Sequence, residues 1–81
     1  MDPESYAPKL IIDARQLNCP LPIIRTKRAI GTVGIGEVVR VLTTDPGALA
    51  DFPAWIDMTG HELVNSVRDG EVYVFEIRRT K

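Results

Sequence analysis

Residues 61–79 read HELVNSVRDGEVYVFEIRR and indicate how the last part of the chain folds. Two runs rich in apolar and β-branched residues, 61–68 and 71–79, stand on either side of an Asp69-Gly70 pair. An Asp-Gly pair between two such runs is a strong signal for a β-hairpin. We therefore expect the chain to end in two antiparallel strands.

Upstream of this hairpin the sequence predicts two more strands and a helix. Residues 37–44 (EVVRVLTT) form the clearest single strand, and residues 9–14 (KLIIDA) form a shorter one. Residues 20–33 between them favour a helix, because proline is common in a first turn and Pro20 opens the segment. Gly31, Gly34 and Gly36 end this helix at about residue 33.

A second helix is expected after residue 44, but it contains a proline. Asp45 followed by Pro46 is typical of a helix start, with the aspartate as N-cap. Pro53 lacks an N–H and would clash with the carbonyl of Leu49, so we expect a break or kink there. Asp51 would then cap a second short helix.

The resulting order is β-α-β-α-β-β. Right-handed β-α-β crossovers place both helices on the same face of one sheet. The fold class predicted is therefore α/β: a two-layer sandwich with a mixed four-stranded sheet and one sheet face poorly covered. We expect a single domain over residues 9–81, preceded by a flexible tail over residues 1–8.

Composition excludes several classes of protein. The chain has 81 residues, 44% hydrophobic and 26% charged, with a formal net charge of −1. This balance is typical of a soluble globular domain and gives no reason to expect binding to nucleic acid or a membrane. No apolar run is long enough to span a membrane, and the first residues lack the apolar core of a signal peptide, so we expect a cytoplasmic protein. With one cysteine and one histidine, neither an intrachain disulfide nor a closed zinc site is expected.

The candidate site is Cys19, in the sequence CPLP (residues 19–22). As N-cap of the first helix, its sulfur would accept a hydrogen bond from Leu21, because Pro20 and Pro22 have no N–H. The two prolines would stiffen the turn. Residues 14–36 contain four cations and no acid, so the helix terminus and these charges should lower the pKa of the thiol. The alternative is that Cys19 is a small buried core residue, as free cysteines often are.

Helical periodicity assigns faces to the first helix. Ile23, Thr26, Ala29, Ile30 and Val33 fall on one side and form the predicted core face. Arg25 and Arg28 fall opposite, with Lys27 at the margin and Ile24 near Arg28. The cations are either a docking surface for a partner, with Ile24 and Leu21 as an apolar patch beside the sulfur, or a solvated face. In the second helix, Phe52, Trp55 and Met58 are expected in the core.

These residues resemble the sulfur carrier proteins of the TusA family, also called SirA-like or YedF-like. The resemblance rests on residues 11–30 (IIDARQLNCPLPIIRTKRAI), 43–47 (TTDPG), 52–55 (FPAW) and 59–63 (TGHEL). It implies a two-layer α/β fold similar to the C-terminal domain of a bacterial translation initiation factor. It also implies that Cys19 carries sulfur as a persulfide, as a sulfurtransferase-type relay without a metal or organic cofactor.

The resemblance further implies partners. The donor would be a cysteine desulfurase or a rhodanese-type protein, and the acceptor a DsrE-like or TusD-like protein, serving tRNA thiolation, molybdenum-cofactor supply or cytoplasmic sulfur oxidation. Asn18 and Leu21 resemble the sulfur-oxidation members more closely. The family usually has Asp-x-x-Gly-x-x-Cys before the signature, whereas this chain has Gln16 at the glycine position, so the turn is either redrawn or tolerates glutamine.

Other functions remain open from the residues alone. One is a regulatory or RNA-binding adaptor in which Cys19 senses redox state or is silent, with Tyr73 and Phe75 stacking bases if their face is uncovered. Another is a structural dimer formed through the sheet. For the carrier we expect a monomer or weak dimer.

Overall fold

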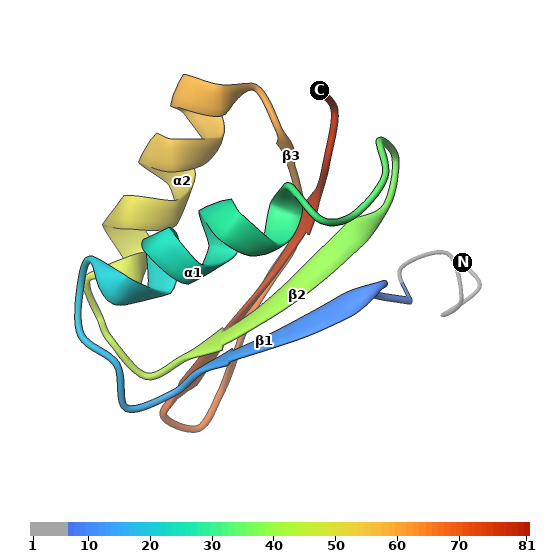
Figure 1. Cartoon of the computed structure of the whole chain (residues 1–81). Coiled ribbons are helices and arrows are strands. Elements are labelled where there is room, and N and C mark those ends of the chain that lie inside the picture. Colours follow the sequence, from blue (N-terminus) through green and yellow to red (C-terminus); the bar gives the residue numbers. More distant parts are fainter. Residues whose placement is uncertain (1–6) are drawn as a thin grey trace.

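The computed structural model describes residues 7–81 and shows six elements of secondary structure (Figure 1). In chain order they are β1 (Leu10–Ala14), α1 (Leu21–Ile30), β2 (Val38–Thr43), α2 (Ala48–Thr59), β3 (Glu62–Asp69) and β4 (Val72–Arg78). The predicted order is confirmed. The predicted tail, residues 1–8, lies outside the described residues for its first six positions.

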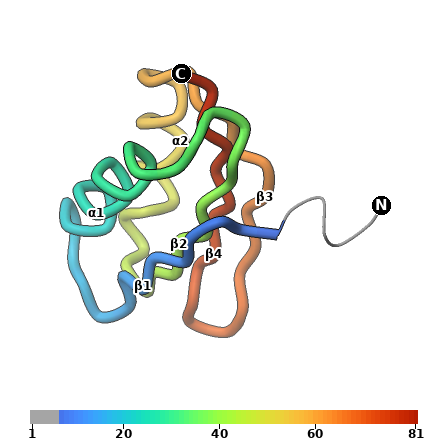
Figure 2. The backbone as a smooth tube through the Cα atoms, turned by 45° about the vertical axis from the view of Figure 1, so that its right-hand side comes forward, coloured from blue at the N-terminus to red at the C-terminus, as the bar shows by residue number. Residues whose placement is uncertain are grey.

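The sheet is mixed and four-stranded, as predicted. Its strand order is β1-β2-β4-β3, with β1 parallel to β2 and the other neighbours antiparallel. Both helices lie on the same face of this sheet, which Figures 1 and 2 show from two directions. The chain is therefore a two-layer α/β sandwich with β1 and β3 as edge strands.

The β3–β4 hairpin forms where the Asp-Gly pair predicts it. Asp69 pairs with Val72, so Gly70 and Glu71 make the turn. Gly70 has φ +62°, a conformation that a glycine adopts without the steric cost of a Cβ. The first residue of this two-residue turn has a positive φ and the second does not, as in type II′ hairpins.

Aromatic side chains join α2 to the sheet. Phe52 is fully buried and stacks on Phe75 of β4, with ring centroids 4.6 Å apart. Trp55 is buried beside them. Because Phe75 lies in the core and Tyr73 packs against it, the idea that these rings form a base-stacking surface is wrong. Met58 was also expected in the core but is 79% exposed, because its position on the helix turns it away from the Phe52 side.

The opposite face of the sheet carries no helix among the described residues. Its centre is polar: Arg40 lies 3.2 Å from the Glu76 carboxylate, which also accepts a hydrogen bond of 3.0 Å from Asn65. Arg78 pairs with Glu62 at 2.6 Å. The opposite charges in these pairs neutralise one another, so the centre of the poorly covered face predicted from the topology is polar.

The second helix differs from the prediction. It runs without a break from Ala48 to Thr59 and contains Pro53 in its interior. The carbonyl that loses its donor belongs to Leu49, a residue on the exposed side of the helix. Asp51 therefore lies in the first turn of α2 instead of capping a separate helix.

Candidate functional site

The loop between β1 and α1 is attached to the end of β2. The Gln16 backbone N–H donates to Oγ1 of Thr44 (3.0 Å), and the Leu17 N–H donates to the Ala14 carbonyl (3.3 Å). Gln16 has φ +69°, so glutamine occupies a left-handed position that favours glycine. Of the two outcomes considered for this position, the turn tolerates glutamine.

Cys19 lies at the end of this loop and is exposed, which excludes the buried-core alternative. Two carboxylates from the other side of the site contact it. The Cys19 backbone N–H donates to Oδ2 of Asp45 (2.7 Å), and its Sγ lies 2.8 Å from Oδ2 of Asp51. Asp45 follows β2 and Asp51 lies in the first turn of α2, so three separate segments meet at Cys19.

The predicted capping of α1 by the sulfur is wrong. The helix begins at Leu21, so Pro20 is the N-cap residue, Pro22 lies in the first turn, and no side chain caps the end. The Leu21 N–H donates to the Asn18 carbonyl (2.9 Å) and is not available to Cys19. The Asn18 carbonyl therefore accepts from the one N–H, that of Leu21, which the prediction assigned to the sulfur.

The role of Asp45 as a helix N-cap also needs correction. Gly47 precedes the first residue of α2 and has no capping side chain. Asp45 instead divides its carboxylate between two backbone donors: Oδ1 accepts from Gly47 (3.1 Å) and Oδ2 from Cys19. This carboxylate joins the start of α2 to the loop that carries the sulfur.

The electrostatics of the sulfur are the reverse of the prediction. The hydrogen bond to Asp51 raises the pKa of the Cys19 thiol, and desolvation and the charges of Asp51 and Asp45 raise it further. Arg15, a predicted source of positive charge, is held by Asp13 through two hydrogen bonds of 2.8 Å. This contact lowers the pKa of Asp13 to about 2. In the structure, the Cys19 thiol donates to Asp51 in an acidic surrounding, which favours its protonated form.

The predicted faces of α1 are confirmed. Thr26 and Ile30 are buried, Ile23 and Ala29 pack against the core, and Val33 is buried just beyond the helix. The docking candidates Ile24, Arg25, Lys27 and Arg28 are exposed. Within residues 7–81, none of these three cations forms a salt bridge.

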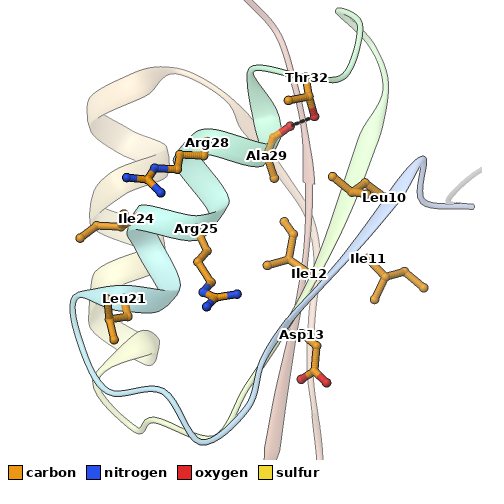
Figure 3. A pocket seen from close by; sticks show the side chains of 10 residues that line it. All are labelled: Leu10, Ile11, Ile12, Asp13, Leu21, Ile24, Arg25, Arg28, Ala29 and Thr32. Atoms are coloured by element: carbon orange, nitrogen blue, oxygen red, sulfur yellow. Dashed lines mark hydrogen bonds between the residues drawn. The ribbon is translucent and has the colours of Figure 1, made fainter.

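A groove lies between α1 and the edge strand β1 (Figure 3). Leu21, Ile24, Arg25 and Arg28 line it from the helix, and residues 10–13 line it from the strand. Figure 3 shows Arg25 directed toward β1. Lys27 is exposed on the same helix and does not line the groove.

The described part of the chain offers neither a metal centre nor a membrane span. In residues 7–81 no three His, Cys, Asp or Glu side chains are grouped as a metal ion would require. No helix in this range has the length and apolar character needed to cross a bilayer.

Comparison with known proteins places the chain in a family. Residues 10–79 match the family described as Sulfurtransferase TusA. The chain belongs to the TusA family. It is 42% identical over 69 residues to the sulfur carrier protein TusA of Allochromatium vinosum, covering 85% of this chain and 91% of the relative. It is 31% identical over 74 residues to sulfur carrier protein TusA of Pseudomonas putida, with 91% and 92% covered.

A solved structure supports the fold of this TusA-family chain. The crystal structure of a SirA-like protein from Desulfitobacterium hafniense superposes with a TM-score of 0.77 at 27% identity. The match covers 89% of this chain and 99% of that one. The TusA and SirA-like resemblance read from the sequence motifs is thereby confirmed, together with the fold.

Asp51 is the site residue that sequence reasoning missed, because it stands 32 positions after Cys19. Part of the site could have been found. The carboxyl ends of adjacent parallel strands meet at the same edge of a sheet, so the loops after β1 and β2 must be neighbours. That rule brings Asp45 close to Cys19, but the register of α2, which brings in Asp51, follows only from the packing of Phe52 and Trp55.

Proposed function

We propose that this chain is a cytoplasmic sulfur carrier that accepts sulfane sulfur as a persulfide on Cys19 and passes it to a second protein. The observation that carries the proposal is the single exposed cysteine at the strand–helix junction of a TusA-family fold. An exposed thiol at a corner of a small domain is accessible to the active-site cysteine of another protein. The relatives named sulfur carrier proteins support the same role.

The chemistry is an exchange without net oxidation. The sulfur of Cys19, as thiolate, attacks the outer sulfur of a persulfide on the donor protein. A new S–S bond forms on Cys19, the S–S bond of the donor breaks, and the donor cysteine leaves with the electron pair as a thiolate. The proton lost by Cys19 neutralises this leaving thiolate. Discharge to the acceptor is the same exchange with the roles reversed.

Pro20, Leu21 and Pro22 are proposed to shape the site. Pro22 is buried and anchors the first turn of α1, whereas Pro20 and Leu21 are exposed beside the sulfur. The two prolines fix φ over the turn and therefore limit the positions that Cys19 can take. A fixed sulfur lowers the ordering that each transfer complex requires.

The donor and acceptor are proposed to dock over α1. Arg25 and Arg28 line the groove with β1, and Ile24 and Leu21 are exposed between them and the sulfur. Cations without partners favour an acidic surface, while the two apolar side chains supply contact area close to the reacting atoms. Lys27, outside the groove, contributes long-range attraction.

Intact-mass analysis tests the carrier role. The protein is incubated with a cysteine desulfurase and cysteine, or with a rhodanese and thiosulfate. We expect the wild type to gain one sulfur atom, reversed by dithiothreitol, and Cys19→Ser to gain none. A wild type that gains no sulfur from either donor system would contradict the proposal.

Charge reversal tests the docking surface. We expect Arg25→Glu with Arg28→Glu to slow protein-to-protein sulfur transfer about tenfold or more at low salt, and less at high salt, because surface charges act mainly on encounter. Arg68→Glu with Lys81→Glu makes the same change in charge elsewhere, on the opposite edge strand and at the C-terminus, and should have little effect. Equal slowing by both pairs would assign the effect to net charge and remove the docking role.

A further inference from the structure

The contact between Cys19 and Asp51 sets the state of the sulfur before any partner arrives. Sγ lies 2.8 Å from Oδ2 of Asp51, and an ionised carboxylate only accepts hydrogen bonds, so the thiol proton lies between the two atoms. Asp51 is in the first turn of α2, beside the loop that carries Cys19. The Cys19 thiol is the donor in this hydrogen bond.

No positive group of the described chain neutralises this carboxylate. Within residues 7–81 Asp51 takes part in no salt bridge. Arg15, on the same loop as Cys19, is held by Asp13, and Arg25 on α1 is directed toward β1. On the β2–α2 side the facing charge is Asp45, which has the same sign and is bound to two backbone amides.

We propose that Asp51 is a positioning residue that holds Cys19 as a protonated thiol in the free carrier, so that the sulfur becomes nucleophilic only when a cationic side chain of the donor protein pairs with this carboxylate. The inference rests on the proposed carrier function, in which Cys19 must attack as a thiolate. It assigns the donor surface a Lys or Arg that faces Asp51, in addition to the acidic groups that face α1.

Two consequences follow from this proposal. In the free carrier the pKa of Cys19 is raised by Asp51, so small electrophiles and oxidants meet little thiolate at neutral pH. In the complex, a donor cation paired with Asp51 weakens the hydrogen bond from the Cys19 thiol to this carboxylate. It also weakens the repulsion between the carboxylate and a Cys19 thiolate, so the sulfur exchange proceeds. The carrier is then selective for donors of the right charge, although its sulfur is exposed.

The first experiment measures the reactivity of Cys19 in the full chain without any partner. Alkylation by iodoacetamide is followed from about pH 6 to about pH 9.5, the range in which thiols ionise. Below the thiol pKa we expect Asp51→Asn to react about fivefold to tenfold faster than the wild type, because the charged acceptor is gone. Asp51→Glu, which keeps the charge, should stay slow.

Asp57→Asn is the matched control, because Asp57 is an exposed carboxylate on the same helix, away from the sulfur. It should react at the wild-type rate. A wild-type profile for Asp51→Asn would overturn the proposal, and so would an equal increase in Asp57→Asn. If Asp51→Asn does not fold, the thiolate absorbance of Asp51→Glu and the wild type is titrated instead; a clearly lower pKa in Asp51→Glu overturns the proposal.

The second experiment separates this inference from the carrier function. Loading is measured with a low-molecular-weight persulfide and with a protein donor. We expect Asp51→Asn to increase the rate with the small persulfide more than with the protein donor, which already supplies a cation to Asp51. An equal increase in the loading rate with both donors overturns the proposal that the protein donor supplies a cation to Asp51. If neither donor loads the wild type while Asp51→Asn still speeds alkylation, the carrier function fails and the control of the thiol by Asp51 stands.

Discussion

Replacing Gln16 by glycine should stabilise the domain. Gln16 has φ +69° and an exposed side chain, while its backbone N–H is bound to Thr44. A left-handed conformation costs a residue with a Cβ about 1–2 kcal/mol, and glycine removes that cost. Glycine also raises the entropy of the unfolded chain, which costs about 0.4–1 kcal/mol. The net gain is roughly 0.5–1 kcal/mol, or about 2–8 °C in Tm for a domain of this size.

The assay is urea denaturation followed by circular dichroism, with thermal melts beside it. Gln16→Ala keeps a Cβ at the same φ and should match the wild type within about 0.5 kcal/mol. Gly70→Ala makes the opposite change at φ +62°, where an added Cβ meets nothing within 4 Å, and should destabilise by about 1–2 kcal/mol. If Gln16→Gly is no more stable than Gln16→Ala, the backbone at this turn is not strained and the reasoning is refuted.

Two other predictions concern the core and the C-terminus. Phe52→Ala removes the ring stacked on Phe75 and should lower the free energy of unfolding in urea by about 3–5 kcal/mol. Met58→Ala, on the exposed side of α2, should lower it by less than about 0.5 kcal/mol. Similar losses in the two variants would contradict the assigned core. His61 accepts a hydrogen bond from the Thr80 N–H (3.1 Å) on Nδ1, and desolvation, Arg79 and Lys81 lower its pKa. Its contribution to stability is therefore present above the unfolded pKa of about 6.5 and lost as the pH falls through the lower folded pKa, so Tm should decline more steeply with acid in the wild type than in His61→Asn.

The order and type of the elements could be predicted from the sequence because each has a local signal. The Asp69-Gly70 pair, the β-branched run at 37–44 and the proline at the start of α1 all act on their own neighbours. Handedness rules then leave few topologies, so both helices fall on one face. One local signal is misleading. Pro53 argues for a break, but packing of Phe52 and Trp55 on the sheet holds α2 together across it.

The charges around Cys19 could be predicted only in part: the topology brings the loop with Asp45 near the sulfur, but the contact with Asp51 depends on the packing of α2. Residues 14–36 contain four cations and no acid, which predicts a positive field at the sulfur. In the fold, Asp45 and Asp51 lie against the loop from the other side, and Arg15 is held by Asp13. The sign of the field at the sulfur is therefore set by residues more than 25 positions away, and no count of nearby charges would have found it.

Two regions of opposite charge flank the sulfur, and this limits how a partner can bind. Arg25 and Arg28 lie on α1, whereas Asp45 and Asp51 lie on the β2–α2 side of Cys19. A partner that is acidic over α1 and basic over Asp51 has one favourable orientation, because reversing it brings like charges together. The two regions also act on different steps. The α1 cations are exposed and govern encounter, which salt screens, while Asp51 is hydrogen-bonded to the reacting atom and governs the thiolate, on which salt acts little at 2.8 Å. If salt reduces the effect of the Arg25→Glu with Arg28→Glu change but leaves the effect of Asp51→Asn unaltered, recognition and chemistry are separated on a domain of 81 residues.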